Sequence, residues 1–349
     1  MRNKFLCLLL VMVILLTGGC GNSNYIKDDD KKIVKYEQTG QNLPSNILCK
    51  PEIGTDLYKL YEQYNDELKI SLNDLPTCSN FKINSNTGGG IWDNLFVKPL
   101  AYLIIKIGKI VGNMGIGLII VGLLIRLVIL PFSYKTHKQS KNMQRVNQEM
   151  QKIELKYRGR DDRDSMMMKS QEMMAIYKKY NVKPASGCLI AFLQLPIFFA
   201  FLSAINRVPA IFEDKLFGLN LGMTPYVGLS NGNYLYLILI ILIALSTYFS
   251  FKYSMKSAGN MNQTPDMQKQ MSMMTNIMVI MIVITSFSLS TALSLYWIVT
   301  YAFIAVQTYL FKRLSNENKN KHNKKNKMSK TKIKDKLEVK RGLKYGNNN

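Results

Sequence analysis

The chain has 349 residues, 47% of them hydrophobic, and a formal net charge of +23. A soluble nucleic-acid-binding protein can carry such a charge, but here the apolar residues are gathered into long blocks. The blocks exclude a soluble class, leave no reason to expect DNA as a partner, and indicate an integral membrane protein whose charges must be read by location.

Residues 1–19 have the composition of a bacterial signal peptide. The start is positive, residues 5–16 are apolar, and small residues precede Cys20. This arrangement resembles the lipobox of bacterial lipoproteins, which implies cleavage before Cys20 and attachment of diacylglycerol and a fatty acyl group such as palmitate to it. An uncleaved signal anchor is the alternative.

Residues 20–90 form a polar segment that we expect to lie outside the cell. Residues 21–90 are nearly neutral, with 8 Lys against 10 Asp and Glu. Residues 56–68 have helical spacing of their apolar side chains. Cys49 and Cys78 both fall in this segment, where a disulfide is chemically allowed, but two cysteines alone leave the pairing open.

Residues 91–112 read as an amphipathic helix that follows a run of three glycines. Trp92 lies near its start, and its polar face carries Asp93, Lys98, Lys106 and Lys109. An aromatic start and a lysine-bearing polar face suit a helix lying in the membrane interface. An unusually charged membrane span is the alternative.

Residues 113–312 carry five apolar stretches of membrane-spanning length. We place these spans at 113–133, 187–207, 233–253, 271–290 and 292–312. The connection 135–183 has 13 basic and 6 acidic residues, and residues 312–349 have 14 and 3. The positive-inside rule therefore places both in the cytoplasm, with the N-terminus outside and the C-terminus inside the plasma membrane.

The cytoplasmic connection, 134–184, is predicted to be a helical hairpin. Its two halves share an apolar seam built of Met143, Val146, Met150, Ile153, Tyr157, Met166, Met173, Ile176, Tyr177 and Tyr180. The methionines either belong to this seam or form an adaptable surface for varied apolar segments. The basic tail, 313–349, suits ribosomal RNA or anionic lipid, or is a solvated appendage.

Arg126 is the most informative residue of the chain. The run 115–132 is otherwise apolar apart from glycine and proline, and an arginine inside such a span costs roughly 2.5–3.5 kcal/mol on insertion scales. Snorkelling toward the cytoplasmic end is the structural alternative. No Asp or Glu lies in any predicted span. Arg126 therefore has no built-in counter-ion, and an acidic partner has to come from another molecule.

Uncharged polar residues interrupt the other spans, which predicts a polar groove inside an all-α bundle of five transmembrane helices. Gln194 lies in the second span, and Tyr296, Thr300 and Gln307 share one face of the fifth beside Trp297. Motifs for nucleotide, metal or nucleophilic chemistry are missing from the sequence, and His137 and His322 are too far apart to suggest a metal site. We therefore expect neither an enzyme nor a cofactor.

Three segments resemble the YidC/Oxa family of membrane protein insertases. They are residues 177–201, YKKYNVKPASGCLIAFLQLPIFFAF; residues 125–131, IRLVILP; and residues 295–307, LYWIVTYAFIAVQ. The resemblance covers about residues 91–312, and with the lipobox and basic tail it is similar to the Gram-positive form. One departure is the turn 288–292, SLSTA, where that family usually has Asn-x-Pro-x-Gly.

The resemblance implies a function and partners. Arg126, Gln194 and Trp297 match positions that line the family's substrate groove. Nascent membrane proteins are the implied clients, the general secretion translocon an implied partner, and the ribosome a partner for the tail. Two rivals stay open from the residues alone: a transporter or channel for an anionic solute, and a structural assembly factor with a vestigial groove.

Overall fold

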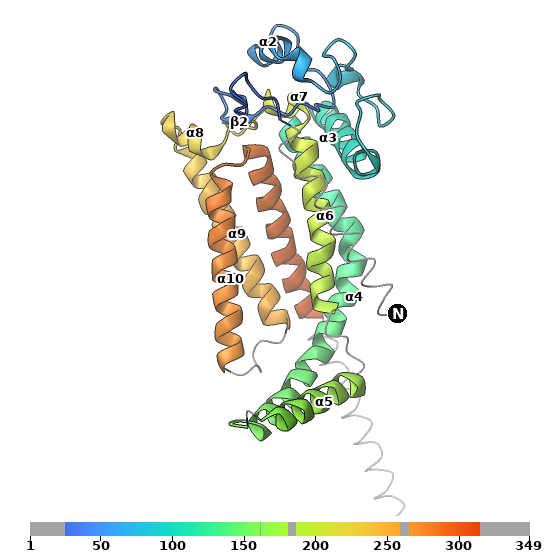
Figure 1. The fold of residues 1–349 in the computed structure, drawn as a ribbon, viewed down its shortest axis with the longest axis vertical. Coiled ribbons are helices and arrows are strands. Elements are labelled where there is room, and N and C mark those ends of the chain that lie inside the picture. Colours follow the sequence, from blue (N-terminus) through green and yellow to red (C-terminus); the bar gives the residue numbers. More distant parts are fainter. Residues whose placement is uncertain (1–24, 161, 181–185, 259–264, 315–349) are drawn as a thin grey trace, which may run out of the picture.

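A computed structural model describes residues 25–160, 162–180, 186–258 and 265–314. The molecule is elongated, with a small folded layer at one end, a bundle of long helices in the middle and one crossing helix at the other end (Figure 1). The predicted signal peptide, Cys20 and the basic tail beyond residue 314 lie outside the described residues, and the side chain of Cys188 is not described either.

The polar segment folds into a compact layer, which we call the cap (residues 25–90). It contains β1 (Lys35–Tyr36) paired antiparallel with β2 (Gln41–Asn42), and the helices α2 (Asp56–Gln63), η2 (Asn65–Glu67) and η3 (Cys78–Asn80). Thr55 caps α2 by accepting a hydrogen bond from the Tyr58 backbone N–H at 3.2 Å. The helical spacing is confirmed for α2, which buries Leu57 and Tyr61.

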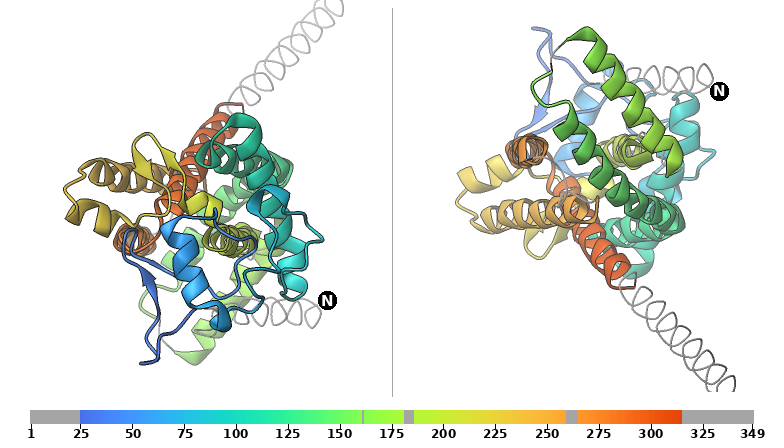
Figure 2. Two further views of the ribbon diagram at one scale, coloured as in Figure 1. Left: turned by 90° about the horizontal axis from the view of Figure 1, so that it is seen from above. Right: turned by 90° about the horizontal axis from the view of Figure 1, so that it is seen from below.

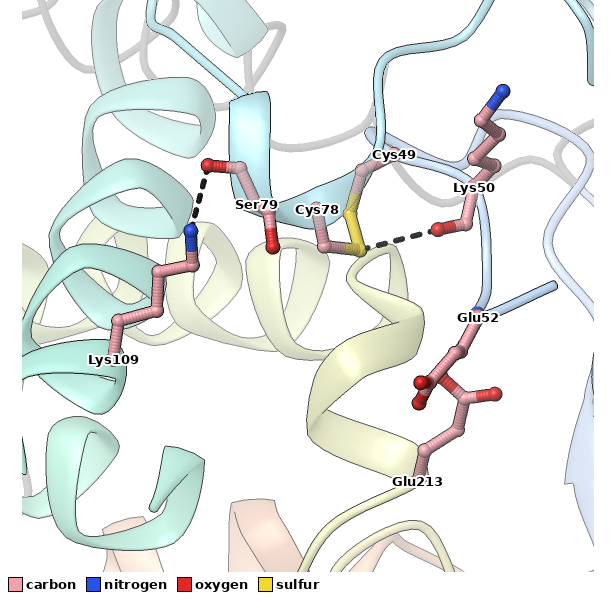
Figure 3. The surroundings of a disulfide bond; sticks show 7 residues. All are labelled: Cys49, Lys50, Glu52, Cys78, Ser79, Lys109 and Glu213. Atoms are coloured by element: carbon pink, nitrogen blue, oxygen red, sulfur yellow. Dashed lines mark hydrogen bonds between the residues drawn. A yellow bond between two sulfur atoms is a disulfide. The ribbon is translucent and has the colours of Figure 1, made fainter. Parts of the chain in front are cut away.

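A disulfide joins Cys49 to Cys78 inside the cap (Figure 3). It connects the loop after β2 to η3, so residues far apart in the sequence of the cap are held together. Ile26, Leu48 and Phe81 are buried around it and belong to the same apolar core as the outer ends of the bundle helices. The cap is therefore a packed part of the fold.

Residues 93–111 form a short π-helix, η4 (Asp93–Val97), and the helix α3 (Lys98–Val111). Placing Lys98 on an exposed polar face was wrong: it is buried, and its Nζ donates to the Ser85 carbonyl of the cap at 3.2 Å. The cap covers this face, so the lysine satisfies a backbone acceptor. A Cβ on Gly117 would lie 2.5 Å from the Gly108 backbone nitrogen, so α3 packs very closely on the next helix.

The first apolar span continues without interruption into the basic connection as one helix, α4 (Met114–Lys156). Asn113 caps its start by accepting from the Ile116 N–H at 3.0 Å, and the Asp214 carboxylate accepts from the Met114 N–H at 2.6 Å. A carboxylate at a helix N-terminus is favourable because it faces unpaired N–H groups and the positive end of the helix dipole.

The helix α5 (Arg163–Lys179) follows a turn and packs on the far end of α4 (Figure 1). On α4, Val146, Ile153 and Tyr157 of the predicted seam are buried. On α5 the seam is shallower: Met173, Ile176, Tyr177 and Tyr180 are half-buried and Met166 is exposed, while the side chain of Met143 lies outside what the structure describes. Polar contacts add to this packing: Glu172 accepts from Lys156 at 2.5 Å and from the Tyr157 hydroxyl at 3.0 Å. The exposed fractions of Met166, Met167 and Met168 are 55–63%.

The remaining elements alternate between long helices and the outer connections. They are α6 (Ser186–Asn206), α7 (Pro209–Phe212), β3 (Lys215–Leu216), β4 (Leu219–Asn220), α8 (Pro225–Ser230), α9 (Leu235–Ala258), α10 (Pro265–Ser286) and a last helix, Thr291–Leu314. Strands β3 and β4 form an antiparallel hairpin. Seen along the long axis, the cap lies over the outer end of α6 (Figure 2).

Three helices within the described residues are long and apolar enough to cross a membrane: Met114–Lys135 of α4, Leu235–Ser254 of α9, and Thr291–Leu314. The described apolar parts of α6 and α10 are shorter, Gln194–Asn206 and Thr275–Ser286. The structure is thus that of a mostly helical, multi-pass membrane protein, in agreement with the predicted class.

Candidate functional site

Arg126 lies in the middle of the bundle and is almost completely buried. Its exposed fraction is 8%, although its neighbours in sequence, Leu127 and Val128, are 51% and 77% exposed. The side chain therefore points toward the other helices rather than along the helix surface. This placement argues against snorkelling as the reason for an arginine here.

The Tyr296 hydroxyl is the polar centre beside Arg126. It lies within side-chain hydrogen-bonding range of the guanidinium, and of Gln194 from α6. Thr300, one turn further along the last helix, lies beside the same hydroxyl, but its Oγ1 makes no well-aligned hydrogen bond within the described residues. Three helices, α4, α6 and the last one, therefore meet at a single tyrosine oxygen.

Aromatic stacking positions the last helix against α6. The Tyr296 ring stacks on Phe201 with centroids 4.2 Å apart, and Trp297 stacks on Phe198 at 5.7 Å. The Tyr296 ring also packs against α4 at Gly122, one turn before Arg126, where a Cβ would be in ordinary van der Waals contact with the ring at 3.4 Å. The hydroxyl is thereby fixed where the guanidinium can reach it.

The electrostatics of this centre are unbalanced. Within the described residues Arg126 makes no ion pair, and its Nη2 has no hydrogen-bond partner. Tyr296 and Tyr301 are the groups that face the guanidinium charge. A phenol oxygen accepts a hydrogen bond but does not neutralise a cation, so the centre is suited to attract an anionic group from outside the chain.

The structure brings together most of the residues that the sequence indicated. Gln194, Tyr296, Trp297 and Thr300 lie around Arg126 or on the adjoining stack, whereas Gln307 lies about three turns beyond Tyr296 and is half-buried. The aromatic pair Phe198 and Phe201 was missed. Their i, i+3 spacing next to Gln194 on α6 was the signal that could have revealed them.

Three buried hydroxyl groups elsewhere in the described part of the bundle also lack partners. Thr247 on α9, and Ser290 and Ser294 at the start of the last helix, have exposed fractions of 0–4%. Their hydroxyl oxygens have no hydrogen-bond partner among the described residues. Each such group is costly in an apolar interior, so Arg126 is not the only unpaired polar group that the described bundle buries.

A second buried arginine, Arg207, holds the outer end of α6, and sequence reasoning missed it. Its Nη1 is 2.8 Å from the Asp93 carboxylate of η4, its Nε donates to the Asn46 carbonyl of the cap at 2.6 Å, and its own carbonyl accepts from the Leu48 N–H at 2.8 Å. In the orientation expected from the sequence, an arginine at this end of the span runs against the positive-inside rule, and this was the available signal.

Another contact between cap and bundle involves a half-buried carboxylate. Glu213, which follows α7, accepts from the Glu52 backbone N–H at 3.3 Å. Burial raises the pKa of Glu213, and the nearby Glu52 carboxylate raises this pKa further, while hydrogen bonds from Thr55 and the Glu52 N–H lower it. The two glutamates lie side by side under the loop that precedes α2 (Figure 3).

Comparison with known proteins places this architecture in a family. The model of the family described as "60Kd inner membrane protein" matches residues 106–320, more than half of the chain. Membrane protein insertase MisCA of Bacillus subtilis is 40% identical over 132 residues, which cover 38% of this chain and 50% of the relative.

Two further relatives carry the same type of name. Membrane protein insertase YidC 2 of Bacillus anthracis is 39% identical over 139 residues, covering 39% of this chain and 54% of the relative. YidC of Nitratidesulfovibrio vulgaris is 36% identical over 129 residues, covering 36% and 23%. The chain spans about half the length of the Bacillus relatives that it matches, and all three names are those of insertases and not of enzymes. The match of residues 106–320, together with these relatives, shows that the chain belongs to the 60Kd inner membrane protein family, the YidC/Oxa family of membrane protein insertases.

Proposed function

We propose that this protein inserts other proteins into the bacterial plasma membrane through a polar groove centred on Arg126. The relatives are named as insertases, and the family model covers all the residues of the arginine centre. A polar segment of the client sits part-way across the membrane in the groove, so that less hydrocarbon has to be crossed. Partition of the client's apolar helix into lipid then drives insertion.

The observation that carries the proposal is a buried arginine without a carboxylate. Arg126 is 8% exposed and within the described residues pairs with a phenol rather than an acid. A charge in a low-dielectric interior attracts an opposite charge strongly, because solvent screens the pair only weakly. Acidic residues in the translocated segment of the client are the natural partners. No nucleotide or catalytic residue is needed, because the client's own partitioning supplies the free energy.

The topology that we propose has five spans and an external cap. Spans 113–133, 187–207, 233–253, 271–290 and 292–312 cross the membrane, and the N-terminal Cys20 carries lipid on the outer face. The basic connection 135–183 and the basic tail then lie in the cytoplasm, which the distribution of Lys and Arg supports. The hairpin of α4 and α5 stands at the cytoplasmic end, where clients arrive.

We further propose that the tail contacts the ribosome and anionic lipid, and that some clients arrive from the general secretion translocon. Residues 312–349 hold 14 basic and 3 acidic residues. This density of positive charge suits binding to the phosphate groups of RNA or lipid without recognition of a base sequence. Removal of the tail after Ser315 is expected to weaken ribosome association and to leave short clients unaffected.

The test compares clients that differ only in the charge of the translocated segment. Arg126→Ala is expected to reduce insertion of acidic clients by about tenfold or more and to spare neutral ones, because only the former lose a charge partner. Arg126→Lys is expected to retain much of the activity, since no fixed carboxylate demands guanidinium geometry. Protease protection of the client in vesicles is the measurement.

Lys106→Ala is the matched control, because Lys106 is an exposed cation on α3, away from the arginine centre. It should insert both clients as the parent does. Equal loss of acidic and neutral clients in Arg126→Ala, or equal loss in the control, would contradict the electrostatic mechanism.

A further inference from the structure

The cap is the part of the chain that the family does not account for. Residues 25–90 precede the residues that match the family model, yet they share one apolar core with the bundle. We propose that the cap is an outward seal, which closes the polar interior against the outer solution while the interior stays available to clients from the cytoplasm and the lipid. The proposal rests on the proposed function, because a polar interior needs a seal where polar clients enter it.

The interior is polar up to its outer end. Ser290 and Ser294 are buried hydroxyls without a hydrogen-bond partner among the described residues, and they lie one to three turns outward of Trp297 and Thr300 on the last helix. Thr247 is a third buried hydroxyl without a partner, and Nη2 of Arg126 also lacks one among the described residues. If the outer end were open, these unpaired polar groups would favour the entry of water and ions into the bundle.

Two layers close that end. The outer connection forms the first: the Thr291 N–H and hydroxyl both donate to the Met223 carbonyl, at 3.0 and 2.7 Å, and the Ala292 N–H donates to Leu221 at 2.9 Å. These bonds fasten the connection directly over Ser290 and Ser294. The turn SLSTA therefore supplies backbone and hydroxyl donors that hold this inner layer.

The cap forms the second layer and is fastened at opposite edges. On one edge the Thr224 N–H donates to the Thr39 carbonyl at 2.8 Å, and a Cβ on Gly40 would lie 2.6 Å from Val227, so that the chain passes tightly over α8. On the other edge, Lys109 Nζ donates to the Ser79 carbonyl at 2.9 Å (Figure 3).

Arg207 fastens the centre of the cap. It is 5% exposed and contacts the cap through Asn46 and Leu48, while its ion pair with Asp93 ties α6 to η4. Removing one member of a buried pair leaves an uncompensated charge that draws in water. Arg207 is therefore the positioning residue whose loss should open the seal.

The experiment measures access to the interior from outside. Ser294→Cys is introduced into the full-length chain, right-side-out vesicles are treated with a membrane-impermeant maleimide, and label on the peptide containing residue 294 is quantified by mass spectrometry. Asn231→Cys, at an exposed position of the outer connection, provides the reference rate. Position 294 is expected to react at least about tenfold more slowly than position 231.

Two independent variants open the seal, and one control does not. Arg207→Ala and Gly40→Val, which release the centre and the α8 edge respectively, are each expected to raise labelling at position 294 about tenfold. Lys59→Ala removes an exposed ion pair with Asp56 in the cap, and labelling at position 294 should be as slow in this variant as in the parent. If Arg207→Ala fails to accumulate in the membrane, Gly40→Val still decides the question.

The proposal is overturned if position 294 in the parent reacts as fast as position 231, or if it stays protected in both opening variants. Client insertion is measured in the same vesicles. A protected position 294 in a parent that inserts no client would count against the proposed function and leave the seal intact, so the two failures are distinguishable.

Discussion

Two buried arginines of one bundle differ in what surrounds them. Arg207, at the outer end, is 5% exposed and meets the Asp93 carboxylate at 2.8 Å and a cap carbonyl at 2.6 Å. Arg126, in the middle, is 8% exposed, and among the described residues the groups that face its charge are the hydroxyls of Tyr296 and Tyr301 and no carboxylate. Burial is nearly the same, and the difference lies in the counter-charge.

Under the proposed function, this difference distinguishes an arginine that holds the fold together from one that serves the groove. A paired and hydrogen-bonded charge in the interior is destabilised when its partner is removed, so Arg207 is expected to matter for stability. A buried charge without a counter-ion has lost its hydration without compensation. Arg126 is therefore expected to lower the stability of the folded protein. Substitutions at the two positions should therefore have opposite effects on unfolding.

The largest effect is expected at Arg207. Arg207→Ala should lower the free energy of unfolding of the outer layer by about 3–5 kcal/mol, because it leaves Asp93 buried without its partner. The measurement is a urea titration followed by the fluorescence of Trp92. This residue precedes Asp93 in the sequence, and its ring centroid lies 4.7 Å from that of Phe96. Trp297→Phe in all variants removes the second of the chain's 2 tryptophans from the signal.

A double-mutant cycle with Asp93→Ala sharpens this prediction. The double variant should lose less than the sum of the single variants, since removing both charges leaves neither uncompensated. Lys59→Ala breaks an ion pair whose side chains are 69% and 61% exposed, and should cost less than about 1 kcal/mol. Additive losses at Arg207 and Asp93 would mean that the pair contributes only through packing.

A smaller effect of opposite sign is expected at Arg126. Arg126→Leu should leave the free energy of unfolding unchanged or raise it by up to about 3 kcal/mol, because an uncompensated charge is replaced by an apolar side chain in a membrane span. Trp297 fluorescence in a Trp92→Phe background follows the interior. A loss comparable to that of Arg207→Ala would show that Arg126 is a structural residue after all.

The sequence was sufficient to single out Arg126 as an unusual charge in an apolar span, but it did not reveal the contacts of Arg207. The reason is physical. An arginine inside a continuous apolar run is conspicuous because its cost depends on the local environment, which the run itself reveals. Arg207 and Asp93 are 114 residues apart, and their pairing depends on how η4 and the cap fold over α6. Local patterns do not encode such a contact.

The same limit explains the other differences. Lys98 reads as solvent-facing from its helical periodicity, yet the cap covers it. The two halves of the hairpin seam were expected to be alike, yet the α5 half is only partly buried, and Glu172 adds polar contacts to it. In contrast, the helices themselves follow from local signals, such as Thr55 before α2 and Asn113 before α4.

The smallest effect concerns Glu213, a half-buried carboxylate at which the cap meets the bundle. Burial raises its pKa in the folded protein, so the folded state binds the proton more tightly than the unfolded chain. The stability from this proton is fully present below the ordinary pKa range of a glutamate and is lost as pH rises through the raised value. Glu213→Gln, which mimics the protonated form, should therefore flatten the pH dependence of cap unfolding from the ordinary pKa of a glutamate up to the raised pKa, and stabilise the cap slightly above the raised pKa. Trp92 fluorescence during urea unfolding reports it, and Glu62→Gln, an exposed carboxylate on α2, is the control. A cap that becomes less stable at neutral pH in Glu213→Gln would mean that the carboxylate is held there as an anion by the N–H groups of Glu52 and its neighbours.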